Sequence, residues 1–181
     1  MLARLEDSVV VVVDLQPSFL AAIHRRDEIL KRSKFLLEVA RSLMVPSMAS
    51  EQYPERMGGT DESVASLIGG HPLSKMAFSC CGIQQFNDSL SSLGRKQTIL
   101  VGIETHICVN QTAHHLVESG HEVIVCADAV SARSQEQHEI GLTRMRDIGV
   151  TIAHTESVAY EWMGGADHER FRDILNLVKA Y

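Results

Sequence analysis

A continuous run of β-branched residues near the start of the chain constrains the fold most. Residues Ser8–Asp14 read SVVVVVD, so five valines in succession precede an aspartate. A strand whose side chains are apolar on both faces must be covered on both faces, as the central strands of parallel sheets are. The run is far shorter than the roughly 20 residues that a membrane-spanning helix needs. It therefore predicts a buried central strand that ends in a carboxylate.

The rest of the chain alternates between helical and strand patterns. Helices are expected at Asp27–Leu43, Ser63–Ile68, Gln84–Leu93, Cys108–Glu118, Gln135–Ile148 and His168–Lys179. Further strands are expected at Val45–Ala49, Leu73–Phe78, Gln97–Gly102, Glu122–Ala127 and Val150–Ala153, and a loop at Glu51–Thr60. Strands separated by helices of this length predict an α/β fold. We expect a single domain over residues 1–181: a three-layer doubly wound sheet of six mostly parallel strands in the order 3-2-1-4-5-6.

Charge and composition argue against nucleic acid and membranes as partners. The chain has 17 Lys and Arg against 23 Asp and Glu, a formal net charge of −6, and no basic run, so we expect no nucleic-acid partner. No apolar run is long enough to cross a membrane and no signal peptide is recognisable, which predicts a cytoplasmic protein without membrane contact. In a reducing compartment its four cysteines are expected to be thiols.

The ends of two strands predict where chemistry occurs. In open parallel sheets ligands bind beyond the carboxyl ends of the strands, where the strand order reverses. Asp14 ends the first strand and Cys108 opens the helix after the fourth, so both are expected to face one crevice. A thiol at a helix N-terminus has its pKa lowered by the helix dipole, which makes Cys108 a candidate nucleophile. The alternative is that Cys108 is a small buried hydrophobic residue.

Lys75 is the third candidate, because it lies in the mostly apolar segment PLSKMAF. A lysine there either points to solvent at a sheet edge or meets a carboxylate. Asp14 alone could cap the next segment or orient Gln16. Together, an acid, an ammonium and a thiol at three strand ends form a set for covalent catalysis, with Asp14 as the base for the thiol proton.

Three motifs in the right order resemble the isochorismatase-like cysteine hydrolases. They are DLQPSF at Asp14–Phe19, SKMAFSC at Ser74–Cys80 and GIETHICV at Gly102–Val109, and SEQYP at Ser50–Pro54 narrows the resemblance to the isochorismatase-domain-containing branch. The resemblance covers about Ser8 to Glu156. It implies Cys108 as nucleophile, Asp14 as general base and Lys75 as the third member of a triad.

The resemblance also implies the surroundings of the triad. A cis peptide bond is expected between Ile103 and Glu104, with the backbone N–H groups of Glu104 and Cys108 serving as oxyanion donors. The substrate pocket is expected to include Gln16, Phe19, Tyr53 and Thr105. His106 lies close enough in sequence to be an additional acid, and a homo-oligomer is expected.

One departure from the family pattern bears on cofactors. Nicotinamidases of this family carry aspartate and histidine metal ligands after the second strand, where this chain has Ser50–Pro54 without histidine. One carboxylate, Glu51, does not make a metal site, so we expect no metal and no cofactor. The arginines expected to hold the carboxylates of isochorismate are not found either.

These residues predict a hydrolase that cleaves the C–N bond of a small amide, or an ester, through a covalent acyl-enzyme. Two alternatives belong to other classes: a catalytically idle scaffold or small-molecule binding module of the same fold, and a redox protein that pairs Cys108 with Cys80 or Cys81. A flavodoxin-like nucleotide site is weaker, because DLQPSF contains no glycine to cradle a phosphate.

Overall fold

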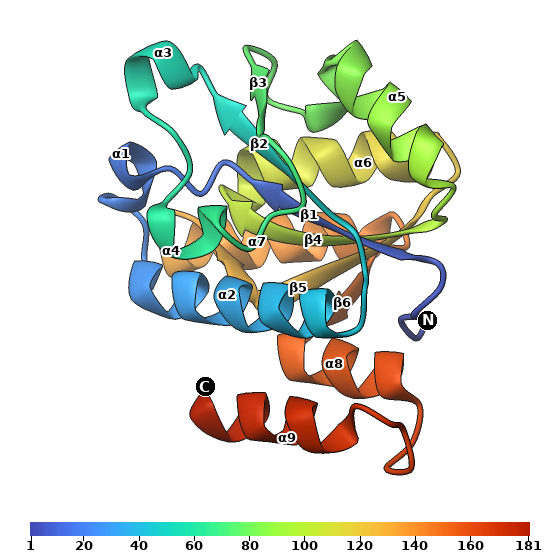
Figure 1. Ribbon diagram of the computed structural model, residues 1–181. Coiled ribbons are helices and arrows are strands. Elements are labelled where there is room, and N and C mark those ends of the chain that lie inside the picture. The colour runs from blue at the N-terminus through green and yellow to red at the C-terminus, as the bar shows by residue number, and fades with distance from the viewer.

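A single six-stranded sheet organises the chain in the computed structural model, which describes residues 1–181 (Figure 1). Its strands are β1 (Ser8–Val13), β2 (Ser47–Gln52), β3 (Leu73–Lys75), β4 (Gln97–Ile103), β5 (Glu122–Ser131) and β6 (Thr151–Ala153). They lie in the order β3-β2-β1-β4-β5-β6, and every neighbouring pair is parallel. The predicted α/β class and strand order are confirmed.

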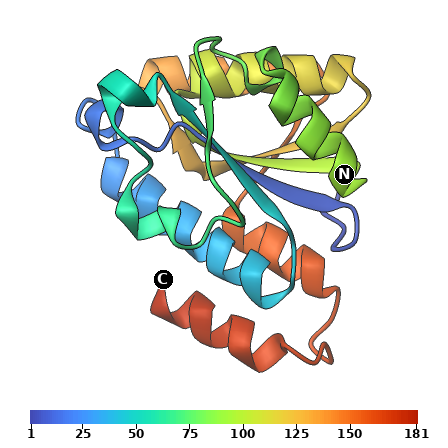
Figure 2. The same cartoon turned by 45° about the horizontal axis from the view of Figure 1, so that its top comes forward.

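Helices cover both faces of this sheet, as Figure 2 shows from a second direction. One face carries α2 (Arg26–Ser42) and α8 (Thr155–Met163), with α9 (Phe171–Ala180) packed outside them. The other face carries α5 (Gln84–Leu93), α6 (Asn110–Glu118) and α7 (Gln135–Asp147). Short helices lie in the connections: α1 (Pro17–Leu20), α3 (Pro54–Met57), α4 (Glu62–Ala65), the 3-10 turn η1 (Cys80–Gly82) and the π-helical turn η2 (Thr105–Val109). None of the helices is long and apolar enough to cross a membrane.

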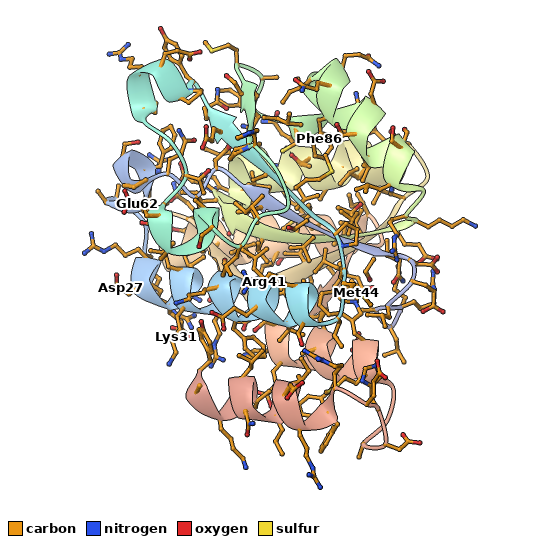
Figure 3. The ribbon with its side chains drawn as sticks, viewed as in Figure 1. Asp27, Lys31, Arg41, Met44, Glu62 and Phe86 are labelled. Carbon is orange, nitrogen blue, oxygen red and sulfur yellow. The ribbon has the colours of Figure 1, made fainter.

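The valines of β1 divide between two hydrophobic cores. Val10 and Val12 pack into the core beneath α2 and α8, whereas Val9, Val11 and Val13 pack into the core beneath α5, α6 and α7. Phe86 of α5, labelled in Figure 3, is fully buried in the second core. Alternate residues of a strand point to opposite faces, so an unbroken valine run fills both layers.

Gly102 allows β1 and β4 to lie close together at the carboxyl edge. Its φ is +117°, and a Cβ atom at this position would stand 2.1 Å from the backbone oxygen of Val13. No side chain fits at that distance, and only glycine adopts this conformation readily. The glycine therefore keeps the two central strands in register immediately before Asp14.

Several predicted boundaries were wrong. The second strand lies later, at β2, because Pro46 precedes it, and the third ends at Lys75 rather than Phe78. The fifth strand runs on to Ser131 through an irregularity opposite Leu100 and Gly102. Helix α8 was not anticipated, although His154 caps it by accepting from the backbone N–H of Glu156. The loop predicted at Glu51–Thr60 contains the end of β2 and all of α3.

Candidate active site

A buried ion pair joins two of the three candidate residues. Asp14 follows β1 with φ of +51°, a left-handed conformation that aspartate tolerates better than most residues. Its Oδ2 lies 2.6 Å from Nζ of Lys75 at the end of β3, and the two side chains are 3% and 0% exposed. Of the two alternatives for Lys75, solvated or paired with a carboxylate, the structure has the paired one.

Gln52 completes the surroundings of the lysine and was missed by the sequence analysis. Nζ of Lys75 donates to Oε1 of Gln52 at 2.7 Å and to the carbonyl oxygen of Ala77 at 3.3 Å. Gln52 ends β2 directly opposite Lys75 in the sheet register. The pairing of β2 with β3 is the signal that could have identified Gln52, because it places this residue beside Lys75. The ammonium group therefore has three oxygen partners, which offsets the cost of burying its charge.

Ser50 holds the other oxygen of the aspartate. Its hydroxyl donates to Oδ1 of Asp14 at 2.8 Å, and it accepts from the thiol of Cys80 at 3.3 Å. Ser50 and Cys80 are both buried. The carboxylate only accepts, so the hydroxyl hydrogen is directed to Asp14 while a lone pair of the hydroxyl oxygen accepts from the thiol. Burial raises the pKa of the Cys80 thiol to about 11, and it is protonated at neutral pH.

Removing the Ser50 hydroxyl should destabilise the fold measurably. In Ser50→Ala, the buried Oδ1 of Asp14 and the thiol of Cys80 lose their shared partner. Leaving buried polar groups unpaired costs about 1–3 kcal/mol in the free energy of unfolding. Urea denaturation of the wild type, Ser50→Ala and the hydroxyl-retaining Ser50→Thr measures this loss. Equal midpoints for Ser50→Ala and the wild type would contradict the assigned hydrogen bonds.

Cys108 lies within η2, so the prediction that it opens a helix was wrong. The helical segment begins at Thr105, and α6 continues from Asn110. Burial, the nearby Asp14 charge and a hydrogen bond to that carboxylate raise the pKa of Cys108 to about 12, against the lowering effect of Lys75. The expected low pKa was therefore also wrong, because burial and the Asp14 carboxylate raise it and the thiol does not stand at a helix N-terminus. At neutral pH the resting residue is a thiol near the Asp14 carboxylate.

Helix α7 holds η2 in place. Gly141 lies so close to η2 that a Cβ atom there would stand 3.0 Å from backbone atoms of Thr105 and His106. The hydroxyl of Thr105 contacts Nδ1 of His138 at 3.0 Å, and Asn110 donates to the carbonyl of Gly141 at 3.1 Å. These three contacts fix the segment that carries Cys108. Thr105 is thus a buried support for the turn.

A small pocket of about 90 Å³ opens beside Asp14 and Cys108. Its other lining residues come from five segments of the chain: Phe19, Gln52, Phe78, Ile103, Glu104 and Ile107. Of the four residues expected in the wall, only Phe19 lies there. The side chain of Gln16, which precedes α1, is buried and instead bonds to the backbone of Gln52 at the end of β2 and to the carbonyl of Gly58 just after α3. Tyr53, 39% exposed, and the buried Thr105 lie outside the lining.

Glu104 forms the rim of the pocket. The peptide bond between Ile103 and Glu104 is cis. The Glu104 carboxylate accepts from Nε of Arg133 at 3.0 Å, so its charge is paired. His106 is not among the lining residues, and burial lowers its pKa.

Other features of the structure lie apart from this site. All four cysteines are free thiols, and no group of three or more His, Cys, Asp or Glu side chains is arranged to hold a metal ion. A larger hollow of about 590 Å³ lies between α2 and α9, where Arg41 and Met44 are labelled in Figure 3. The pocket at the carboxyl edge is the one that contains Asp14 and Cys108.

The doubly wound parallel sheet with an acid, a lysine and a cysteine at its carboxyl edge defines an isochorismatase-like fold. The isochorismatase domain family matches residues 8–157. The chain therefore belongs to the isochorismatase family. Isochorismatase domain-containing protein 2 of Danio rerio is 36% identical over 172 residues, which covers 94% of this chain and 86% of the relative. The chain spans 59% of isochorismatase domain-containing protein 1 of Salmo salar, at 33% identity over 168 residues.

Solved structures share the fold. The MAR1 ribonuclease of Caenorhabditis elegans superimposes with a TM-score of 0.93 at 32% identity, covering 99% of this chain and 93% of that one. The YcaC gene product of Escherichia coli, described as an octameric hydrolase of unknown specificity, has a TM-score of 0.87 at 20% identity. The match covers 100% of this chain and 96% of YcaC.

Proposed function

We propose that this protein is a cysteine-dependent hydrolase that cleaves the C–N bond of a small amide, or the corresponding ester, through a covalent acyl-enzyme. One observation carries the proposal: the buried Asp14–Lys75 ion pair lies beside the Cys108 thiol in a pocket. A charge pair that is almost fully buried is costly to maintain. Proton transfer to and from a nucleophile requires a charged group beside it, and this requirement explains why the buried pair is kept despite its cost.

The first half of the reaction forms the acyl-enzyme. Asp14 accepts the thiol proton as the sulfur of Cys108 bonds to the carbonyl carbon, and the carbonyl oxygen becomes an oxyanion. Collapse of this intermediate breaks the C–N bond, and protonated Asp14 gives its proton to the departing nitrogen. The ammonium group of Lys75 stays charged and keeps Asp14 in position throughout.

The second half releases the acid. Asp14, again ionised, takes a proton from a water molecule, whose oxygen attacks the thioester carbonyl. Cleavage of the C–S bond yields the carboxylic acid, and the proton returns from Asp14 to the sulfur. The backbone N–H groups of Glu104 and Cys108 are the proposed donors to the oxyanion in both halves of the reaction. The resemblance to the isochorismatase-like cysteine hydrolases implies this role.

RNA cleavage is the competing activity, because the nematode structure is named a ribonuclease. The charge of this chain argues against it. A formal net charge of −6 and a pocket whose only charged lining groups are Asp14 and Glu104 would repel a phosphate backbone.

Homo-oligomerisation, the state described for the bacterial YcaC protein, is also proposed here. Light scattering measures it.

Cys108→Ala should abolish the activity while leaving the fold intact, because the thiol is the nucleophile. The assay measures ammonia released from propionamide and isobutyramide, and p-nitrophenolate released from p-nitrophenyl propionate. We expect hydrolysis by the wild type and a loss of at least about a thousandfold in Cys108→Ala. Cys126→Ala, a change in the buried core of β5, is the control for loss of a cysteine.

Three outcomes would contradict the proposal. Equal rates for Cys108→Ala and the wild type would remove the nucleophile. Cleavage of a single-stranded RNA by the wild type but not by Cys108→Ala, with no hydrolysis of amides or esters, would favour a nuclease instead. A wild type inactive on every probe would favour the scaffold alternative.

A further inference from the structure

The wall of the pocket beside Cys108 is mostly apolar. Phe19 of α1, Ile103 at the end of β4 and Ile107 of η2 surround the thiol, and Phe78 stands at the mouth, 55% exposed. Gln52 is the only neutral polar side chain in the wall, and its amide oxygen already accepts from Lys75 while its NH2 donates to the carbonyl of Met76. A group entering this pocket is therefore held chiefly by apolar contact.

The charges around the pocket disfavour an anion. Its two charged lining residues, Asp14 and Glu104, are both acidic. The side chain of Lys75 is 0% exposed and forms an ion pair with Asp14, and Arg133 forms an ion pair with Glu104. A carboxylate on the substrate would be desolvated here without a free cation to pair with it, at a substantial cost.

The size of the pocket sets a second limit. Its volume is about 90 Å³. An engineered apolar cavity of about 150 Å³ in another protein holds benzene. The space beside Cys108 thus suits an aliphatic group of a few carbon atoms rather than an aromatic ring.

From these three features we infer that the acyl part of the substrate is short, uncharged and apolar, such as an unbranched or singly branched aliphatic chain. The inference rests on the proposed function, since it places this acyl group on Cys108. It defines the class of amide or ester that the site accepts. It excludes substrates with a carboxylate on the acyl side.

Two alkylating reagents that differ in charge test the inference without a known substrate. Iodoacetamide is neutral and iodoacetate is anionic, and each places a two-carbon unit on the same thiol. The rate constants at Cys108 are measured at pH 9 by peptide mass spectrometry, and their ratio is divided by the ratio for free glutathione. We expect an excess preference for iodoacetamide of at least about tenfold.

A charge-gain variant provides the reciprocal test. Ile107→Arg places a cation in the pocket wall. We expect the preference for iodoacetamide over iodoacetate, divided by that of glutathione, to fall at least about tenfold. Ile107→Leu keeps the wall apolar and should retain the wild-type ratio. Leu93→Arg adds the same charge at the end of α5, at the opposite edge of the sheet from the pocket, and should also retain it.

The possible failures are distinguishable. If Cys108 reacts but shows the glutathione ratio, or if Ile107→Arg leaves the ratio unchanged, the inference of an uncharged acyl group is overturned and the proposed function stands. If Cys108→Ala hydrolyses the amide and ester probes as fast as the wild type, the proposed function fails, and the inference fails with it.

Discussion

Asp14→Asn is expected to abolish hydrolysis and to make Cys108 more reactive towards iodoacetamide. Loss of the general base should lower turnover by about 10²–10⁴-fold. The carboxylate is also one of the groups that raise the pKa of Cys108 to about 12, through its charge and its hydrogen bond, whereas Lys75 lowers that pKa. With the carboxylate gone, the lysine charge acts alone, and the pKa of Cys108 should fall below that value.

The two readouts should therefore change in opposite directions. Alkylation of Cys108 is measured against pH, and its midpoint should move to lower pH in Asp14→Asn because the thiolate forms more readily. Turnover is measured with p-nitrophenyl propionate in the same preparations. Parallel loss of alkylation and turnover would contradict the assigned effect of the Asp14 carboxylate on the pKa of Cys108, and unchanged turnover would remove Asp14 from the mechanism.

Lys75→Met should have the largest effect on stability. It leaves the Asp14 carboxylate buried with no cation and removes the hydrogen bonds to Gln52 and Ala77. Breaking a buried pair by removing one partner costs about 3–5 kcal/mol in the free energy of unfolding. Urea denaturation measures the loss, and turnover should fall as well, since Asp14 is no longer held in place.

An exposed lysine in a similar pair serves as the matched control. Lys34 lies 4.0 Å from Glu38, with side chains 42% and 25% exposed. Surface pairs of this kind contribute about 0–1 kcal/mol, so Lys34→Met should change the stability little. Equal stability of Lys75→Met and Lys34→Met would contradict the contribution of the Asp14–Lys75 pair to the free energy of unfolding.

The fold was predictable because its signals are local. The valine run of β1, glycines such as Gly94 and Gly120 at helix ends, and regular alternation of strands and helices determine the strand order through general rules of chain connection. The boundaries were less predictable. A β-strand can continue past an irregularity, as β5 does, and helix α8 follows β6 with only His154 between them.

The site was predictable at the strand ends and less so around them. Asp14, Lys75 and Cys108 follow from the edge of the sheet at which ligands bind and from the motif resemblance. Gln52, Ser50 and Cys80 join the site only through the register of β2 with its neighbours, which a single sequence does not define. The high pKa of Cys108 depends on how deeply the thiol is buried, a property of the packed structure.

Detection of the acyl-enzyme tests the central claim most directly. The wild type is mixed with p-nitrophenyl propionate, quenched in acid within the first turnover, and examined by intact and peptide mass spectrometry. The account predicts one propionyl group on the peptide that contains Cys108, and none in Cys108→Ala. A propionyl group on Cys81 or on a lysine instead, or an equal adduct in Cys108→Ala, would contradict it.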